Sequence, residues 1–138
     1  MRDSRAWAEE RLREKGLRVT IPRVAVLSYL AGATHHPTAD EIRAAVNRLV
    51  PTAARASIYN VLHSLRAARL VSEVVVDDDA VRYDANLGRH HHFVCTACGG
   101  VEDVPWAVVP PFPKRRLPGG QSVESVSVTL RGHCNACR

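Results

Sequence analysis

The fold follows from residues 55–85, which read RASIYNVLHSLRAARLVSEVVVDDDAVRYDA. The first half predicts a helix over residues 55–68, because Ile58, Leu62 and Leu65 recur at the spacing of one helix face. Polar side chains form a second stripe on that helix. The second half predicts two strands, 71–76 and 80–83, joined by a turn of three aspartates. A polar-faced helix followed by a hairpin is the end of a winged helix-turn-helix.

Three further helices are predicted before this stretch. The first spans residues 4–15, with Ser4 as its cap and Gly16 as its end. The second spans residues 20–31 and has a proline in its first turn. The third opens with Thr38 and Glu41, a capping-box pair, and a proline at position 51 breaks it. Together with the last helix and the hairpin, these three helices are the elements of a winged helix-turn-helix domain.

The charge of the 138-residue chain is unevenly placed. The formal net charge is +5, and all of it falls within residues 1–75, while the remaining residues are balanced. The four cysteines lie in that balanced part. The split suggests one half that binds a polyanion and another that binds metal. No apolar run reaches the ~18 residues of a bilayer span, and the charged first residues lack a signal-peptide core, so we expect a cytoplasmic protein without membrane contact.

Two CxxC units predict a zinc site formed by Cys95, Cys98, Cys134 and Cys137. Zinc prefers four soft ligands at tetrahedral corners, and each CxxC turn supplies two of them. In a reducing compartment such pairs are more often metal ligands than disulfides. Redox dithiols or free thiols are the alternatives. A four-thiolate site has no open position, so this zinc would stabilise the fold and not catalyse a reaction.

The histidine run before the first cysteine belongs to a different site. On a strand, alternate side chains share a face, so His90 and His92 point one way and His91 the other. Cys95 is an odd number of residues from His92 and points away from the pair. His36, Asp84 and Asp103 are further candidate ligands, but their spacing in the sequence does not bring them together. Each histidine, taken alone, is more often a surface or hydrogen-bonded residue.

The sequence therefore predicts an α+β chain. A winged-helix domain occupies residues 1–84, a hinge residues 85–90, and a small mixed α/β domain with the zinc site residues 91–138. Strands are expected over residues 92–95, 101–104 and 123–130. The proline-rich segment between the last two is expected to be irregular.

The chain resembles the ferric uptake regulator (Fur) family over nearly its whole length. The resemblance rests on several ordered motifs, GLRVTIPR, HPTADEI, ASIYNVLHSLRAARLV, VRYDAN, HHHFVCTACGGVEDV and GHCNAC. It implies a DNA-binding winged helix, a C-terminal dimerisation domain, one structural Zn(II) per chain and one regulatory Fe(II) or Mn(II) per chain. It also implies a homodimeric repressor that binds an inverted repeat in double-stranded DNA, and not an enzyme.

The resemblance also implies the regulatory ligands. They are His36, Asp84, His90, His92 and Asp103. The peroxide-sensing, PerR-like branch is most similar, because it carries aspartate at the place of Asp103, and actinobacterial catalase-gene repressors are especially similar. Hydrogen peroxide would then be the signal, and His36 and His90 would be the residues that are oxidised. Mixed nitrogen and oxygen ligands suit Fe(II) or Mn(II) better than zinc.

Two features depart from the family pattern. The region between Asp103 and Cys134 is short and rich in proline, without the long helix usual there, which affects the dimer interface. Val126 stands where an additional metal site often has a histidine, so no such site is expected. His35, His91 and His133 are expected not to be ligands.

DNA contacts are predicted from the winged-helix class, whose last helix enters the major groove. Bases or phosphates would be contacted by Ser57, Tyr59 and Asn60, and phosphates by Lys15, Arg18, Arg23 and Arg55. The acidic turn argues against deep insertion of the hairpin into DNA.

Several other functions fit parts of this pattern. A repressor that senses iron or zinc level would use the same ligands, and oxidation of the zinc-bound cysteines is another possible switch. A non-haem iron oxygenase would use a two-histidine, one-carboxylate set, but nothing in the sequence suggests a substrate pocket. A thiol oxidoreductase would use CxxC, but no βαβ pattern surrounds it.

Overall fold

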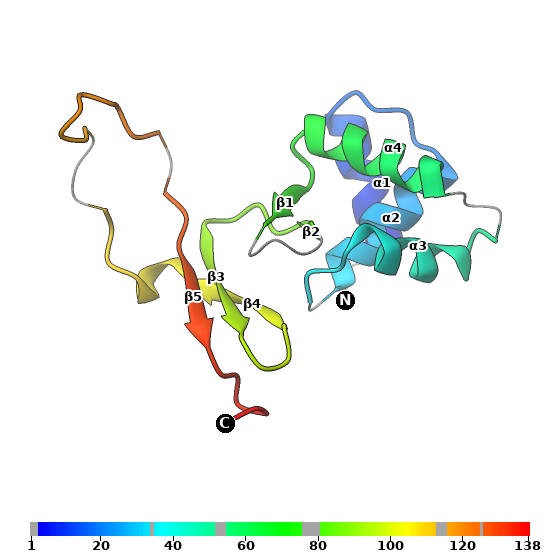
Figure 1. Cartoon of the computed structure of the whole chain (residues 1–138). Coiled ribbons are helices and arrows are strands. Elements are labelled where there is room, and N and C mark those ends of the chain that lie inside the picture. Colours follow the sequence, from blue (N-terminus) through cyan, green and yellow to red (C-terminus); the bar gives the residue numbers. More distant parts are fainter. Residues whose placement is uncertain (1–2, 34, 52–54, 76–80, 113–115, 125) are drawn as a thin grey trace. The chain divides into compact units, whose positions relative to one another are not determined.

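The computed structural model describes residues 3–33, 35–51, 55–75, 81–112, 116–124 and 126–138. The chain divides into two compact units, Met1–Leu87 (unit 1) and Gly88–Arg138 (unit 2). Within the described residues, unit 1 carries helices α1 to α4 followed by strands β1 and β2, and unit 2 carries strands β3, β4 and β5 (Figure 1). This mixture confirms the predicted α+β class. The hinge and the dimerisation role assigned to the second part remain predictions.

The four helices of unit 1 match the expected ones to within a few residues. They are α1 (Ser4–Glu14), α2 (Ile21–Gly32), α3 (Ala39–Asn47) and α4 (Arg55–Ala67). The caps explain where the helices begin. Thr20 and Thr38 accept hydrogen bonds from the N–H groups of Arg23 and Glu41. The prediction that Ser4 caps α1 is wrong, because the carboxylate of Asp3 accepts the hydrogen bond from Arg5 N.

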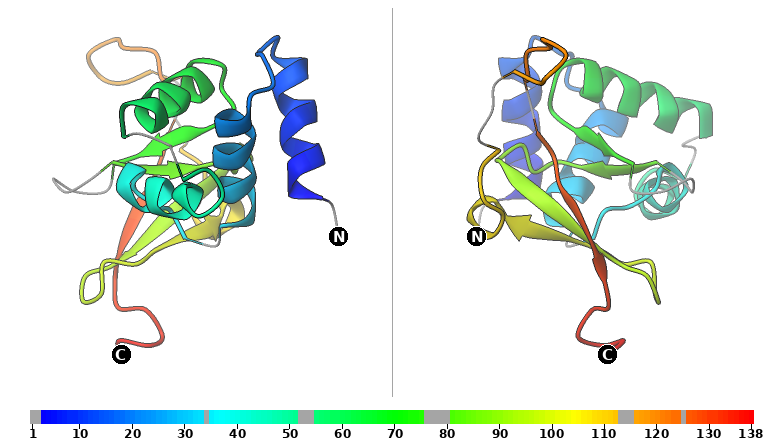
Figure 2. Two further views of the ribbon diagram at one scale, coloured as in Figure 1. Left: turned by 90° about the vertical axis from the view of Figure 1, so that its right-hand side faces the viewer. Right: turned by 60° about the vertical axis from the view of Figure 1, so that its left-hand side comes forward.

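The core of unit 1 lies where the helices meet one another and the hairpin. Apolar side chains at helical spacing point inward from every helix, and α1 lies beside α2 in both views of Figure 2. The predicted stripe of α4 is confirmed, because Ile58, Leu62 and Leu65 are all buried. The other core residues are Ala8, Leu12, Val26, Leu27, Leu30, Ala39, Ile42, Val46, Leu70, Val71 and Tyr83.

The hairpin is shorter than its sequence suggested. Strand β1 (Ser72–Val74) pairs antiparallel with β2 (Arg82–Asp84), with Glu73 opposite Tyr83. Val75 lies outside the ladder and is exposed. The predicted turn at residues 77–79 is outside the described residues.

Unit 2 is built on a three-stranded sheet in the order β4–β3–β5. Strand β3 (His90–Cys95) pairs antiparallel with β4 (Val101–Pro105) and parallel with β5 (Thr129–Gly132). The expected strand over residues 123–130 therefore has the wrong bounds. The side chains of Val126 and Val128 line a hollow beside His91, and the carbonyl of Val128 accepts a hydrogen bond from His92 N at 3.1 Å, just before β5 begins. The segment after β4 is largely irregular, as expected, apart from a short 3-10 helix, η1 (Trp106–Val108).

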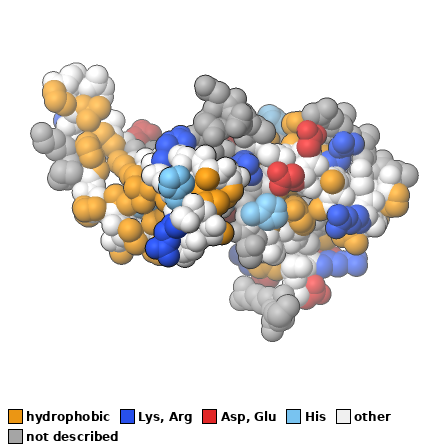
Figure 3. All heavy atoms as spheres, turned by 60° about the horizontal axis from the view of Figure 1, so that its bottom comes forward, with side chains coloured by type: hydrophobic (Ala, Val, Ile, Leu, Met, Phe, Trp, Pro, Cys, Tyr) orange, Lys and Arg blue, Asp and Glu red, His pale blue; other side chains and the backbone are white. Residues whose placement is uncertain are grey.

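Several large hydrophobic side chains of unit 2 are exposed. Hydrophobic side chains gather toward the left of Figure 3, whereas charged side chains of both signs are scattered over unit 1. The exposed large hydrophobic residues of unit 2 are Val108, Phe112, Leu117, Val126 and Leu130. None of the helices described in the chain is long and apolar enough to cross a membrane.

Candidate metal centres and nucleic-acid interface

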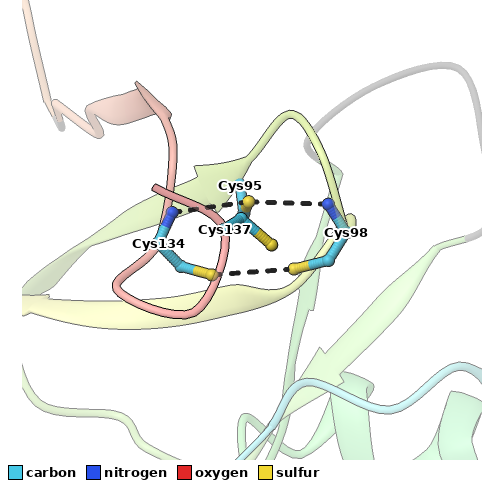
Figure 4. Close-up of side chains that lie close together, drawn as sticks. All are labelled: Cys95, Cys98, Cys134 and Cys137. Carbon is cyan, nitrogen blue, oxygen red and sulfur yellow. Dashed lines mark hydrogen bonds between the residues drawn. The ribbon is translucent and has the colours of Figure 1, made fainter.

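The four cysteines converge at one end of the sheet in unit 2 (Figure 4). Cys95 ends β3 and Cys98 follows in a tight turn, where Gly99 adopts a φ of +74° that favours glycine. The parallel pairing of β5 with β3 places Gly132 opposite Cys95 and so brings the second CxxC turn alongside. All four sulfurs lie within 4.8 Å of one another.

The sulfur positions fit a tetrahedral zinc. With Zn–S bonds of about 2.3 Å, the edges of a tetrahedron are about 3.8 Å long. The sulfurs of Cys98 and Cys134 are 3.9 Å apart. The four cysteines are free thiols, so no disulfide competes for them. The geometry argues against the alternative of two separate redox dithiols, since both CxxC units contribute to a single cluster.

The protonation of the cluster also fits a bound cation. Backbone N–H groups of Cys134 and Cys98 point at the sulfur of Cys95, at 3.4 and 3.5 Å, and lower the pKa of that thiol to about 6. Hydrogen bonds with the thiols of Cys134, Cys95 and Cys98 raise the pKa of Cys137 to about 12. Four thiolates this close repel one another, and a dication is the partner that would allow all of them to form.

Two of the other candidate ligands meet within unit 1. His36 lies just before α3 and is buried, and Asp84 ends β2. The Nε2 atom of His36 is 3.2 Å from Oδ2 of Asp84. We call this pair the unit 1 half-site. Spacing in the sequence did not predict that these two residues, 48 positions apart, lie together.

The three remaining candidates meet within unit 2. The antiparallel register places Asp103 opposite His92. Oδ1 of Asp103 is 3.4 Å from Nε2 of His90 and 3.8 Å from Nε2 of His92. The two imidazole rings are 4.8 Å apart, centroid to centroid. The predicted sharing of a strand face by His90 and His92 is confirmed. We call these three residues the unit 2 half-site.

His91 has a packing role that the sequence did not reveal. It points to the opposite face of β3, where its side chain is buried. Its ring stacks on Trp106 with centroids 4.4 Å apart, and the guanidinium of Arg89 lies 5.6 Å from the Trp106 ring. His91 and Trp106 border a hollow of about 310 Å³, together with Phe112 and neighbouring valines and prolines. The alternation rule assigned the face of His91 correctly but not its partner.

The predicted DNA-contacting residues of α4 are on its outer surface. Ser57, Tyr59 and Asn60 are all exposed, with Ser57 and Tyr59 flanking the buried stripe and Asn60 on the opposite side. Lys15 and Arg18 are exposed as well. Their contacts with DNA remain predictions.

The other two predicted phosphate contacts are Arg23 and Arg55. The guanidinium of Arg23 donates a hydrogen bond to the carbonyl of Arg18 at 2.9 Å, so part of its hydrogen-bonding capacity is used within the protein. The side chain of Arg55 lies outside the described part of the chain.

One further residue contacts the unit 1 half-site and was missed from the sequence. Arg82 donates a hydrogen bond from its guanidinium to the carbonyl oxygen of His36 at 2.9 Å. Strand alternation places Arg82 and Asp84 on one face of their strand, but it does not reveal the contact with His36.

Comparison with known proteins gives a consistent family. The model described as "Ferric uptake regulator family" matches residues 14–130. The transcriptional regulator FurA of Mycobacterium tuberculosis is 43% identical over 100 residues, which cover 72% of this chain and 67% of that protein. The peroxide-responsive repressor PerR of Staphylococcus aureus is 39% identical over 92 residues, covering 67% of this chain and 62%, less than two thirds, of that protein.

Solved structures show the same fold. The Helicobacter pylori ferric uptake regulator aligns with a TM-score of 0.72 at 19% identity, over 99% of this chain and 97% of that one. PerR from Streptococcus pyogenes aligns with a TM-score of 0.55 at 29% identity, over 99% and 95%. The ferric uptake regulator from Pseudomonas aeruginosa with manganese aligns with a TM-score of 0.70 at 28% identity, over 93% and 98%.

Proposed function

Since this chain belongs to the ferric uptake regulator family, we propose that it is a metal-dependent transcriptional repressor that binds DNA as a homodimer. The observation that carries the proposal is the presence of two chemically different ligand sets. Four cysteines form one closed cluster, whereas histidines and aspartates form the two half-sites. A soft, closed set suits a permanent zinc, and a harder, mixed set suits a metal that exchanges.

The second part of the proposal is that the two half-sites bind one regulatory metal together. The ligands would be His36 and Asp84 from unit 1, and His90, His92 and Asp103 from unit 2. Three neutral imidazoles and two carboxylates balance the charge of Fe(II) or Mn(II). A metal that takes ligands from both units favours whichever arrangement of the units satisfies all five, by its differential affinity for that arrangement.

DNA binding is assigned to α4 and its surroundings. The exposed Tyr59 and Asn60 would read base edges, and the basic residues before them would bind phosphates. A homodimer would read an inverted repeat, because the twofold symmetry of the protein requires matching half-sites. The net charge of +5 supports this assignment.

Hydrogen peroxide is the signal that we propose. The S. aureus relative is named as a peroxide-responsive repressor, and the S. pyogenes neighbour is described by its role in peroxide sensing. Fe(II), when bound, supplies the reactivity towards peroxide. The ring of His36 or His90 gains one oxygen atom and loses two electrons, the O–O bond of peroxide breaks, and water leaves. An oxidised imidazole is a poorer ligand, so the regulatory metal is lost and the repressor releases DNA.

A second candidate signal is the level of the metal itself. The M. tuberculosis relative is as similar to this chain as the peroxide-responsive one, and its name specifies only a transcriptional regulator. The same five ligands would serve such a sensor. In that case peroxide would not change DNA binding at constant metal concentration.

A panel of DNA-binding assays separates these candidates. The probe is a duplex selected from a random library by the Mn(II) form of the zinc-loaded full chain. We expect no tight binding without Fe(II) or Mn(II), release from the Fe(II) form by peroxide, and no release from the Mn(II) form. Release from both forms would point to cysteine oxidation, and release from neither would point to metal-level sensing.

Peptide mapping by mass spectrometry completes the test. After peroxide treatment of the Fe(II) form, the peptides that contain His36 or His90 should each gain the mass of an oxygen atom. Peroxide-dependent release without oxygen on either peptide would exclude the proposed oxidation chemistry.

A further inference from the structure

Strand β2 holds the unit 1 half-site through three consecutive residues. The guanidinium of Arg82 donates to the carbonyl of His36 at 2.9 Å. The backbone N–H of Tyr83 donates to the carbonyl of Pro37 at 2.9 Å. The carboxylate of Asp84 lies 3.2 Å from Nε2 of His36. The backbone of His36 and its ring are thus attached to the same short strand by separate side chains.

The hydrogen bonds between β2 and the His36 segment involve buried residues and have a fixed geometry. His36 is 4% exposed, and Pro37 belongs to the most deeply buried residues of the chain. A planar guanidinium forms charge-assisted hydrogen bonds in a fixed geometry, which a flexible ammonium does not reproduce. Arg82 therefore fixes the position of the His36 backbone, and the direction in which the imidazole leaves the chain follows from that position.

We propose that Arg82 is a positioning residue for the regulatory metal, which prepares His36 for coordination before any metal arrives. This inference rests on the proposed function, since it assumes that His36 is a ligand. Groups that orient a metal ligand through a hydrogen bond typically change metal affinity by about 10- to 100-fold when they are removed.

Two effects of Arg82 on a bound cation have opposite signs, and this makes the proposal testable. Its positive charge repels a cation nearby, so removing the charge alone would raise metal affinity. Its hydrogen bond orders a ligand, so removing the bond lowers metal affinity. The direction of the change in affinity therefore reveals which role Arg82 has.

The hydrogen bonds between β2 and the segment of His36 and Pro37 also connect the unit 1 half-site to helices α3 and α4. Thr38 forms a β-bridge with Arg82 and caps α3 by accepting a hydrogen bond from Glu41 N. Residues of α3 and α4, among them Ile42 and Ile58, belong to the same buried core. A metal that fixes His36 thus acts on a segment that leads directly into the helix pair of the winged-helix domain.

The test measures Mn(II) affinity by calorimetry on the zinc-loaded full chain. We expect Arg82→Gln to lower the affinity at least tenfold and Arg82→Lys, which keeps the charge, to recover part of the loss. Ser72→Ala is the matched control. Ser72 lies on the same hairpin, and its hydroxyl donates to the backbone carbonyl of Asp84 at 3.4 Å and not to the carboxylate, so its substitution should leave the affinity unchanged.

A second readout does not depend on bound metal. The imidazole resonances of His36 in the metal-free chain, identified by comparison with His36→Ala, should broaden or shift in Arg82→Gln and stay unchanged in Ser72→Ala. If Arg82→Gln fails to fold, Arg82→Lys serves for both measurements.

The outcomes separate this inference from the proposed function. An unchanged or higher Mn(II) affinity in Arg82→Gln, with normal affinity in the wild-type chain, overturns the positioning role alone. A fall in thermal stability without a change in Mn(II) affinity does the same, because it shows a structural role only. Absence of Mn(II) binding in the wild-type chain overturns both the proposed function and this inference.

Discussion

At the scale of the residue, three adjacent histidines on one strand have two different roles. His90 and His92 share a face and approach the carboxylate of Asp103, whereas His91 points to the other face and stacks on Trp106. The residues are chemically identical, so only the alternation of the strand distinguishes them. A substitution at His90 should therefore change metal binding and not stability, whereas a substitution at His91 should change stability.

His90→Ala should abolish the metal response and leave the fold intact. The side chain of His90 is one of the proposed ligands, and its loss removes a nitrogen donor without opening the core. We expect Mn(II)-dependent DNA binding to fall by at least tenfold. Zinc content should remain one per chain by elemental analysis, and the far-UV circular dichroism spectrum should be unchanged. Loss of zinc in this variant would contradict the separation of the two sites.

His91→Ala should instead reduce stability. Its ring is buried and stacked at an interplanar angle of 16° on Trp106. Stacked pairs contribute about 0.5–1.5 kcal/mol beyond the burial of their area. We expect a loss of about 1–3 kcal/mol in the free energy of unfolding. Urea unfolding followed by tryptophan fluorescence measures it, and the exposed His133→Ala is the control. An effect no larger than that of the control would contradict the packing role.

At the scale of the element, the cysteine cluster joins the two ends of the sheet where β3 and β5 lie side by side. Strand β5 is short and joins β3 by parallel pairing, which usually requires a well-covered crossover connection. The preceding segment provides little regular structure. A tetrahedral metal held by the CxxC turns at the ends of both strands would fix the register in which Cys95 lies opposite Gly132.

Zinc removal should detach β5 while unit 1 stays folded. A chelator or Cys137→Ser takes away the anchor, so the amide of Thr96, which donates to Gly132 O at 2.8 Å, should lose protection from hydrogen exchange. The amide of Tyr83, bonded to Pro37 O within unit 1, should keep its protection. Exchange monitored by NMR resolves both amides. Simultaneous loss of exchange protection at the amides of Thr96 and Tyr83 would mean that the two units unfold together.

The exposed face of α4 leads to a prediction about base recognition. Asn60 is exposed on the proposed reading surface and can pair with adenine. Asn60→Ala should cost about 1–3 kcal/mol of binding and relax sequence preference at a single position of each half-site, whereas Lys15→Gln should weaken binding to all sequences and reduce the salt dependence. Binding to a set of single-base variants at several salt concentrations distinguishes the two. A uniform loss in Asn60→Ala would argue against base contact.

The local elements were predictable where residues carry their own signal. The buried stripe of α4, the threonine caps of α2 and α3, and the shared face of His90 and His92 follow from periodicity and capping chemistry. Contacts between segments that are distant in the sequence were not predictable. The hydrogen bond from Arg82 to the carbonyl of His36 and the stacking of His91 on Trp106 depend on tertiary packing, which periodicity does not encode. The bounds of β5 were also misjudged, because regular pairing with β3 begins only around Val128, whose carbonyl accepts a hydrogen bond from His92 N, and continues to Gly132.

At the scale of the whole molecule, unit 2 has a small buried core. Its buried residues among those described are His91, Val94, Cys95 and Val101. Small domains bury a low fraction of their surface and need metals or partners for stability. We expect zinc to supply one source of stability. We also expect a second copy of the chain to cover the exposed hydrophobic residues of unit 2, as in the proposed homodimer.

A charge introduced into this apolar surface should therefore separate the dimer. In Phe112→Glu, a side chain that is 46% exposed in the single chain would place a carboxylate within the interface, where desolvation of the charge opposes association. We expect a monomer by sedimentation velocity and loss of binding to an inverted repeat, with weak binding to each half-site preserved. Leu49→Glu, at a position that is 76% exposed in unit 1, is the matched control and should remain dimeric. If Phe112→Glu stays dimeric and binds the inverted repeat normally, the subunits must meet through another surface, and the apolar side chains of unit 2 need a different explanation.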